Sequence, residues 1–161
     1  MPEPIAERPG FVPGYGILPA DEGAGLMPWG DAAAKLTASR NYWVSTTRAD
    51  GRPHAAPVWG VWLDGALLFG TDDRSVKGRN IARSPEVVVH LESGDDVVII
   101  EGVATKVFDE TTMRKYADAY EEKYAFRPEA APGTAYAVRP RVAFSWTERE
   151  FPGTATRFRF G

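Results

Sequence analysis

The chain has 161 residues, a formal net charge of −3 and no cysteine. Its length and its 43% hydrophobic fraction suit one packed domain. The charge excludes a global field that attracts nucleic acid, and the lack of cysteine excludes disulfides and thiolate chemistry. The longest apolar run, Val97 to Ile100, is too short to span a membrane, and the start lacks the pattern of a secretory signal. We therefore expect a soluble cytoplasmic protein with no nucleic-acid or membrane partner.

Residues 1–28 are rich in proline and glycine and show no sustained periodicity, which predicts an N-terminal arm laid over the domain or a partner subunit. Four apolar side chains are expected to anchor this arm: Phe11, Tyr15, Ile17 and Leu18. Residues 29–161 are predicted to form the domain. It begins with a short helix from Trp29 to Ser39, whose Leu36 points inward.

From Asn41 onward the apolar residues recur with a period of two, which predicts strands. The pairs Asp50–Gly51 and Asp64–Gly65 are strong hairpin signals, so the strands follow one another as an antiparallel meander. Gly102 indicates a bulge or a close approach of another backbone in the fifth strand. The predicted strands are Tyr42–Thr47, His54–Leu63, Ala66–Thr71, Glu86–Leu91, Val97–Phe108, Tyr136–Trp146 and Ala155–Phe160.

Two more helices are predicted among these strands. A short one begins near Ser75 and ends before Pro85. A longer one runs from Glu110 to about Ala125 behind the N-cap residue Asp109. Its apolar stripe consists of Met113, Tyr116, Ala117, Tyr120 and Tyr124. Six or seven strands with few helices predict a mainly β (α+β) chain that forms a closed or nearly closed antiparallel barrel.

The segment Thr71–Asn80 holds the strongest candidate for a binding site. A strand leads into a polar loop and a helix start at Ser75, where exposed N–H groups suit a phosphate. The Ser75 hydroxyl adds a donor, Lys77 and Arg79 add charge, and Gly78 lets the backbone come close. The alternative is a solvated first helical turn with an ordinary serine cap, and the local pattern alone favours this alternative.

The strand around Pro57 is the second candidate. The small residues Ala55 and Ala56 leave room for a flat ring, and Pro57 removes a ladder donor, so the strand edge is expected to be partly open. Trp59 and Trp62 are three residues apart and should face opposite sides of the sheet. One would fill the barrel and the other would line an interface or a ligand, with core packing as the alternative for each.

Side chains for direct catalysis are not apparent. His54 and His90 are the only histidines and have no partners at metal-ligand spacing, so no metal site is expected. Each is interpreted as a satisfied or surface imidazole, with an axial haem ligand as the alternative. The paired aspartates lie in predicted turns, where they support the backbone. Catalytic residues are therefore unassigned, and a bound cofactor is expected to carry the chemistry.

From about Trp29 to its end, the sequence resembles the pyridoxamine-5′-phosphate-oxidase-like superfamily of split β-barrels of the FMN-binding type. Within it, the sequence is similar to the actinobacterial flavin/deazaflavin oxidoreductases of the B group, which use coenzyme F-420. The segments that carry the resemblance are Tyr42–Thr46, Asp50–His54, Pro57–Trp59, Phe69–Thr71, Ser75–Asn80, Val87–Val89 and Gly153–Phe158.

The resemblance implies a homodimer with two cofactor sites at the subunit interface. Ser75 and Lys77 would bind the cofactor phosphate, with Arg79 and Asn80 close by, and residues 56–59 would lie along the ring system. The full set implied for cofactor binding is His54, Ala56, Pro57, Val58, Trp59, Thr71, Arg74, Ser75, Lys77, Gly78, Arg79 and Asn80.

Thr71 would lie under the polar edge of the ring, Arg74 would meet the acidic tail of F-420, and the partner subunit would complete the pocket. The expected function is hydride transfer from F-420 to a small unsaturated or electron-poor acceptor. The alternatives are an FMN-dependent oxidoreductase and a non-catalytic carrier of flavin, deazaflavin or haem. The tail, Arg157–Gly161, departs from the Arg-Leu-His type of substrate motif of true pyridoxamine phosphate oxidases, so that activity is not expected.

Overall fold

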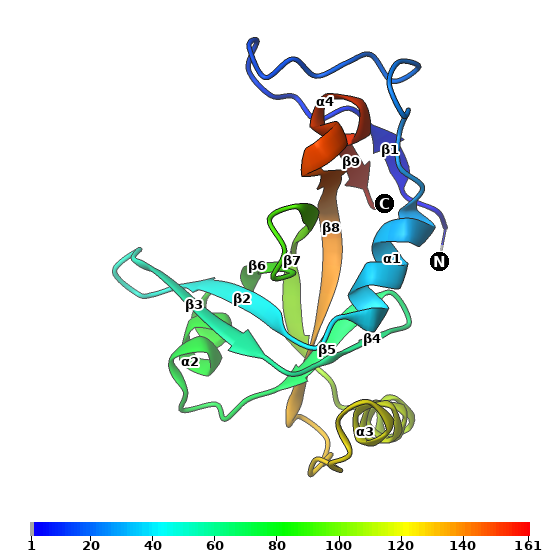
Figure 1. Ribbon diagram of the computed structural model, residues 1–161. Coiled ribbons are helices and arrows are strands. Elements are labelled where there is room, and N and C mark those ends of the chain that lie inside the picture. Colours follow the sequence, from blue (N-terminus) through cyan, green and yellow to red (C-terminus); the bar gives the residue numbers. More distant parts are fainter. Residues whose placement is uncertain (1) are drawn as a thin grey trace.

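The computed structural model describes residues 2–161, and strands dominate their regular structure (Figure 1). The strands are β1 (Ile5–Glu7), β2 (Tyr42–Thr47), β3 (Pro53–Val58), β4 (Val61–Leu63), β5 (Ala66–Gly70), β6 (Glu86–His90), β7 (Asp96–Lys106), β8 (Ala135–Thr147) and β9 (Thr156–Arg159). The helices are α1 (Trp29–Ala38), α2 (Val76–Arg83), α3 (Glu110–Tyr124), the 3-10 turn η1 (Glu148–Glu150) and α4 (Phe151–Thr154). None of these helices has the length and apolar character needed to cross a membrane.

Strand β8 organises the sheet. It pairs with β7 along its length, with β5 through its first residues and with β9 through its last. From β7 the sheet continues through β6 and β2 to β3, and every pairing is antiparallel. Within residues 2–161, β3 has no strand on its outer side and does not pair with β4, so the barrel is open there. The predicted mainly β, antiparallel fold is confirmed, whereas the predicted closure is not, because the sheet is open between β3 and β4.

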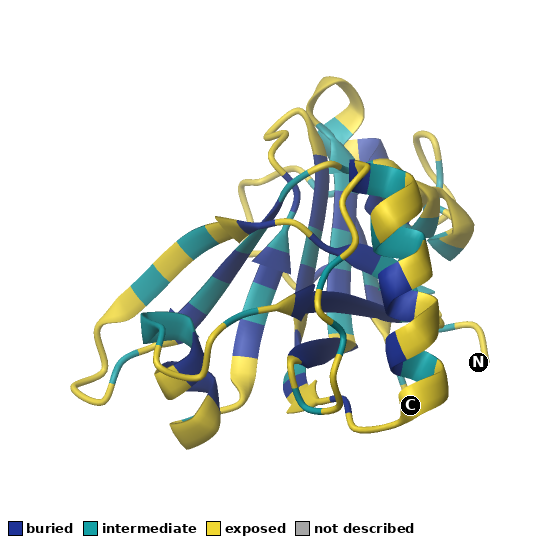
Figure 2. Ribbon diagram, turned by 90° about the horizontal axis from the view of Figure 1, so that it is seen from below, coloured by how far each residue is buried: buried dark blue, intermediate teal, exposed yellow. Residues whose placement is uncertain are grey.

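Buried and exposed residues alternate along the strands, so one face of the sheet packs against a shared core (Figure 2). Val44, Val89, Ile100 and Ala143 lie opposite one another across β2, β6, β7 and β8, and all four are fully buried. Leu36 of α1 packs into the same cluster, as predicted. Burial of each valine, leucine or isoleucine contributes about 1.5–3 kcal/mol, so this row holds the curved sheet together.

Two local predictions are confirmed in detail. The register of β7 against β8 shifts between Glu101 and Gly102, which is the predicted bulge. A Cβ atom on Gly102 would collide with the carbonyl oxygen of Arg139, so the position requires glycine. At the start of α3, a carboxylate oxygen of Asp109 accepts the Thr112 N–H at 2.7 Å, as expected of an N-cap.

The predicted strand from His54 to Leu63 is wrong as a continuous element, because it breaks at Trp59–Gly60 into β3 and β4. Gly60 lies so close to β5 that a Cβ atom would stand 2.7 Å from the Leu68 carbonyl oxygen. The two tryptophans face different surroundings, as predicted. Trp62 packs at the edge of the core, whereas Trp59 is 40% exposed.

The sequence pattern missed β1, η1 and α4. The pairing of β1 with β9 joins opposite ends of the chain, so no local signal marks it. The guanidinium of Arg8 ties the N-terminal arm to the C-terminal segment by donating to the carbonyl oxygens of Ala155 and Gly153 at 2.8 and 3.2 Å. The ring of Phe11 stacks on Phe151 with centroids 6.1 Å apart, so the arm is anchored, as expected.

Candidate functional site

The candidate site lies where α2 packs beside the free edge of β3 (Figure 1). Among the strands of residues 2–161, β3 pairs only with β2. It begins with Pro53 and contains Pro57, neither of which has an N–H group to donate. Proline is tolerated in this position because the edge carries no further strand. The expectation of an open edge is confirmed, and the edge leaves backbone carbonyl and N–H groups accessible beside the helix.

The first turn of α2 has a serine cap, and the hydroxyl group of this serine is hydrogen-bonded to Thr71. The Oγ atom of Ser75 accepts the Gly78 N–H at 3.0 Å and lies 2.9 Å from Oγ1 of Thr71. Ser75 is therefore the N-cap residue of α2. The cap does not exclude a phosphate, because the bond between the two hydroxyl groups uses one of their protons and leaves the other available to donate.

Gly78 was expected to let the backbone come close to a ligand, but it packs against the loop that precedes α2. It is buried, and a Cβ atom there would stand 2.5 Å from the Asp72 carbonyl oxygen and 3.0 Å from the Asp73 Cα atom. The close approach at Gly78 is thus made by the loop that precedes α2. That loop is held by Asp73, whose carboxylate accepts bonds from Lys106 at 2.7 Å and from Tyr136 at 3.0 Å. These two donors lower the pKa of Asp73.

Lys77 on α2 and His54 on β3 carry polar groups that have no partner within residues 2–161. The ammonium of the half-buried Lys77 forms no hydrogen bond or ion pair there. Nδ1 of His54 is buried and also has no hydrogen-bond partner there. Burial lowers the pKa of His54, and the positive charges of Arg48 and Lys77 lower it further. A free cation beside an orphaned imidazole nitrogen fits an anionic oxygen-rich group.

The remaining residues predicted on this segment have partners within the chain. Arg74 forms an ion pair with Asp72 at 2.9 Å, which lowers the pKa of Asp72 to about 2, and its side chain is 90% exposed. Arg79 donates to the Arg74 carbonyl oxygen at 2.6 Å. Asn80 is buried, donates to Oγ1 of Thr46 at 3.0 Å and accepts from Arg83 at 3.2 Å. Asn80 therefore holds the helix to the sheet.

The ring-binding residues predicted on β3 do not share one face. His54, Ala56 and Val58 alternate with Pro57, and Ala56 lies opposite the buried Val44. A flat ring that touches all of residues 56–58 must therefore lie along the free edge of the strand, not on either face. Trp59 lies beyond the end of β3, where its ring stacks on Tyr124.

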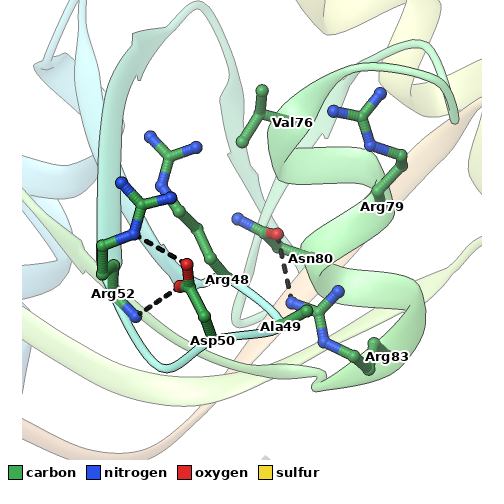
Figure 3. Close-up of a pocket in the computed structure, with 8 residues that line it drawn as sticks. All are labelled: Arg48, Ala49, Asp50, Arg52, Val76, Arg79, Asn80 and Arg83. Carbon is green, nitrogen blue, oxygen red and sulfur yellow. Dashed lines mark hydrogen bonds and ion pairs between the residues drawn. The ribbon is translucent and has the colours of Figure 1, made fainter.

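A pocket of about 290 Å³ adjoins this edge, between the β2–β3 hairpin and α2 (Figure 3). Within the hairpin Arg52 pairs with Asp50 at 2.8 Å, and on the helix side Arg83 donates to the Thr47 carbonyl oxygen at 2.6 Å. Sequence reasoning missed Arg48, Arg52 and Arg83 as site residues, although arginines flanking the Asp-Gly turn were a usable signal. The lining residues are Arg48, Ala49, Asp50, Arg52, Val76, Arg79, Asn80 and Arg83. The lining thus contains four arginines and one carboxylate, of which only Arg52 and Asp50 pair with each other.

Comparison with known proteins gives a family match to this chain. Residues 30–147 match the family model described as pyridoxamine 5′-phosphate oxidase. A pyridoxine/pyridoxamine 5′-phosphate oxidase of Acidothermus cellulolyticus is 30% identical over 122 residues, which cover 71% of this chain and 50% of that protein. The chain thus spans about half the length of this curated relative.

Solved structures share the fold. A conserved hypothetical protein from Mycobacterium tuberculosis superposes with a TM-score of 0.66 at 26% identity and covers 78% of this chain and 88% of that one. A structure described as an F420 reductase superposes with a TM-score of 0.53 at 22% identity and covers 68% of this chain and 93% of that one. Both support a split barrel of the type found in this family.

Proposed function

Because this chain belongs to the pyridoxamine 5′-phosphate oxidase family, we propose that it is a cytoplasmic, homodimeric oxidoreductase that binds coenzyme F-420 at the free edge of β3. The bound deazaflavin supplies hydride for a small unsaturated or electron-poor acceptor. Strand β3 and α2 bind and orient the cofactor, and the surrounding side chains limit access of water. FMN, whose phosphate would use the same groups, is the alternative cofactor.

The observation that carries this proposal is the pair of unmatched groups on Lys77 and His54. A buried imidazole nitrogen without a partner costs stability. The ammonium of Lys77, whose positive charge acts on His54, is free to pair with an anion bound nearby. Ser75 lies two residues before Lys77 and adds a hydroxyl and the N-terminal end of α2. Together these groups fit a phosphate group, with the attached ring system extending along β3 toward Trp59.

The arginine-lined pocket favours F-420 over FMN. A single phosphate needs few cations, and Lys77 with the start of α2 already provides for it. Arg48, Arg52, Arg79 and Arg83 add a second cationic region beside the first. F-420 has further carboxylates beyond its phosphate, whereas FMN has none, so the additional region matches the longer cofactor.

Oxidation of pyridoxamine phosphate has no support at the C-terminus of this chain. The carboxylate of Glu7 pairs with Arg157 at 2.5 Å and with Arg159 at 2.8 Å. These two arginines are therefore engaged by β1 in holding the chain ends together. They are poorly placed to recognise a separate phosphorylated substrate, which agrees with the missing Arg-Leu-His type of motif.

The outer face of the sheet supports the homodimer. Trp43, His90, Ile99 and Phe144 form a row across β2, β6, β7 and β8 on the face opposite the core, and each is only half-buried in the monomer. A second copy would cover this face and bring its own residues to the free edge of β3. We expect the wild-type protein to sediment as a dimer and Ile99→Lys to sediment as a monomer, because a charge on this face opposes its burial.

A titration with both cofactors tests the proposed site. Purified protein is titrated with F-420 and separately with FMN, and binding is followed by absorbance and fluorescence. Lys77→Ala should bind F-420 about tenfold or more weakly and keep its fold, because the ammonium supports no internal contact. Lys115→Ala, on the exposed side of α3, is the control and should bind like the wild type. Equal affinity of Lys77→Ala and wild type for both cofactors would refute the site assignment.

Turnover separates an enzyme from a carrier. Wild-type protein loaded with reduced F-420 is offered a panel of unsaturated and nitroaromatic acceptors, and cofactor oxidation is followed by absorbance. Oxidation that depends on both protein and acceptor supports the oxidoreductase. Tight binding without oxidation across the panel would support the carrier alternative instead.

A further inference from the structure

Trp59 presents a large aromatic surface at the end of the proposed cofactor strand. It lies directly after β3, and its ring stacks on Tyr124 of α3 with centroids 4.5 Å apart and planes inclined by 3°. The side chain remains 40% exposed. One face of the indole is therefore covered by Tyr124, and much of the rest is accessible to solvent.

The backbone beneath this ring is fixed by side chains of α3. The Tyr124 hydroxyl accepts the Gly60 N–H at 3.0 Å and donates to the Arg40 carbonyl oxygen at 2.6 Å. The ammonium of Lys123 donates to the Gly60 carbonyl oxygen at 3.0 Å and to the Tyr42 hydroxyl at 2.7 Å. Both polar groups of Gly60 are thus bound, which makes the Trp59 position rigid. A rigid aromatic ring loses little entropy when a ligand stacks on it.

The guanidinium of Arg40 makes cation–π contacts with both stacked rings. Its Cζ atom is 4.8 Å from the centre of the Trp59 ring and 5.6 Å from the centre of the Tyr124 ring. A guanidinium on the far face of Trp59 would be much farther from Tyr124 than this. Within residues 2–161 this guanidinium forms no ion pair or hydrogen bond, so it is available to the acidic group of a ligand that stacks on the exposed part of the indole.

We propose that Trp59 and Arg40 form the recognition site for a planar aromatic anion, with its ring stacked on Trp59 and its acidic group paired with Arg40. This inference rests on the proposed function, because it names the class of acceptor that would lie beside a ring bound along β3. Stacking on an indole favours electron-poor rings, and a guanidinium favours a carboxylate. The acceptor class is therefore an electron-poor aromatic carboxylate.

Binding to the cofactor-free protein tests the inference without turnover. The probe is 4-nitrobenzoate, and nitrobenzene is the matched probe without a charge; affinities come from equilibrium dialysis. Trp59→Ala should weaken both probes by about tenfold, whereas Phe126→Ala, which removes another exposed aromatic ring, should change neither. Arg40→Gln should weaken 4-nitrobenzoate by about tenfold and leave nitrobenzene unchanged, and Arg114→Gln should change neither.

Specific results overturn the inference. The inference is wrong if Trp59→Ala binds 4-nitrobenzoate with unchanged affinity. It is also wrong if Arg40→Gln loses the same affinity for both probes. A change of oligomeric state in Trp59→Ala with unchanged probe affinity would assign the ring to a subunit interface instead.

F-420 titration of the same variants separates the two proposals. If probe binding depends on Trp59 and Arg40 but the protein does not bind F-420, only the proposed function is refuted. If the protein binds F-420 but probe binding does not depend on these two residues, only the acceptor site is refuted.

Discussion

The side-chain amide of Asn80 donates to the hydroxyl of Thr46 at 3.0 Å, and both residues are almost completely buried. This bond fixes α2 on β2. Thr46 lies opposite His54 in the β2–β3 ladder, and Lys77 is three residues before Asn80, a neighbour on the helix surface. The Asn80–Thr46 bond therefore sets the position of the Lys77 ammonium relative to the free edge of β3.

A double-mutant cycle on this pair should show strong coupling. Asn80→Leu or Thr46→Val alone leaves a buried polar group unpaired and should lower the free energy of unfolding by about 1–3 kcal/mol. The double variant removes both groups, so it should lose less than the sum of the single losses. Urea unfolding at neutral pH measures the three differences. Strictly additive losses would show that the bond does not hold the helix to the sheet.

Gly78→Ala should disturb the loop that carries Asp72 and Asp73, because the new Cβ atom would stand 2.5 Å from a backbone oxygen. The loop must shift, and the strain should lower the free energy of unfolding by about 1–3 kcal/mol and weaken F-420 binding. Gly94→Ala is the matched control, since nothing lies within 4 Å of a Cβ atom there. Thermal unfolding and cofactor titration of both variants check this. Equal behaviour of the two variants would contradict the close packing of the loop against Gly78.

Local sequence patterns predicted those parts of the fold that depend on local physics. Alternation located β2 and β7, and the caps Ser75 and Asp109 marked the starts of α2 and α3, because each signal lies within a few residues of its effect. The break at Trp59–Gly60 was not predictable in this way. It depends on Tyr124, which is 64 residues away in the sequence, and on the way the chain folds back so that the backbone of β5 approaches Gly60.

The candidate site was predicted only in part for the same reason. Lys77 and Arg79 could be selected as cations from their place near a helix start, and their role in binding stays a prediction. Arg48 and Arg83 could not be grouped, because only the packing of α2 against the hairpin brings them to one pocket. Similarly, Asn80 has the residue type of a ligand-binding group, but the structure shows that Thr46 and Arg83 occupy its polar atoms.

His54 should report on anion binding through its pKa. Burial and the nearby positive charges lower this pKa below the ordinary value of 6.5 in the folded protein. The unfolded chain thus binds more protons near pH 6, so this group makes the free energy of unfolding rise with pH up to about 6.5 and level off above it. A phosphate beside Lys77 opposes the positive field and should raise the pKa of His54.

Proton NMR titration of the imidazole signals, with and without FMN or F-420, measures this change. The variant His90→Gln leaves one histidine and so assigns the His54 signal. Lys77→Ala should raise the pKa of His54 in the cofactor-free protein, because one of the depressing charges is removed. A pKa of His54 that does not respond to either cofactor would place the phosphate elsewhere.

The last prediction tests whether Arg48 or Arg74 binds the acidic tail of F-420. Arg48 lines the pocket and has no ion pair within residues 2–161, whereas Arg74 is paired with Asp72 and is almost fully exposed. If the carboxylates of F-420 lie in the pocket, Arg48→Gln should weaken F-420 binding by about tenfold and FMN binding much less. Arg74→Gln should have little effect on either cofactor, since an exposed ion pair contributes little.

Raising the ionic strength should shrink the effect of Arg48→Gln on F-420, because salt screens exposed charges. Titrations of both variants with both cofactors at low and high salt provide the measurement. A larger loss in Arg74→Gln than in Arg48→Gln would show that the acidic tail leaves the site along the loop before α2, as the sequence alone suggested. Equal losses of F-420 and FMN in Arg48→Gln would instead assign this arginine to the phosphate, and the pocket would then no longer favour F-420.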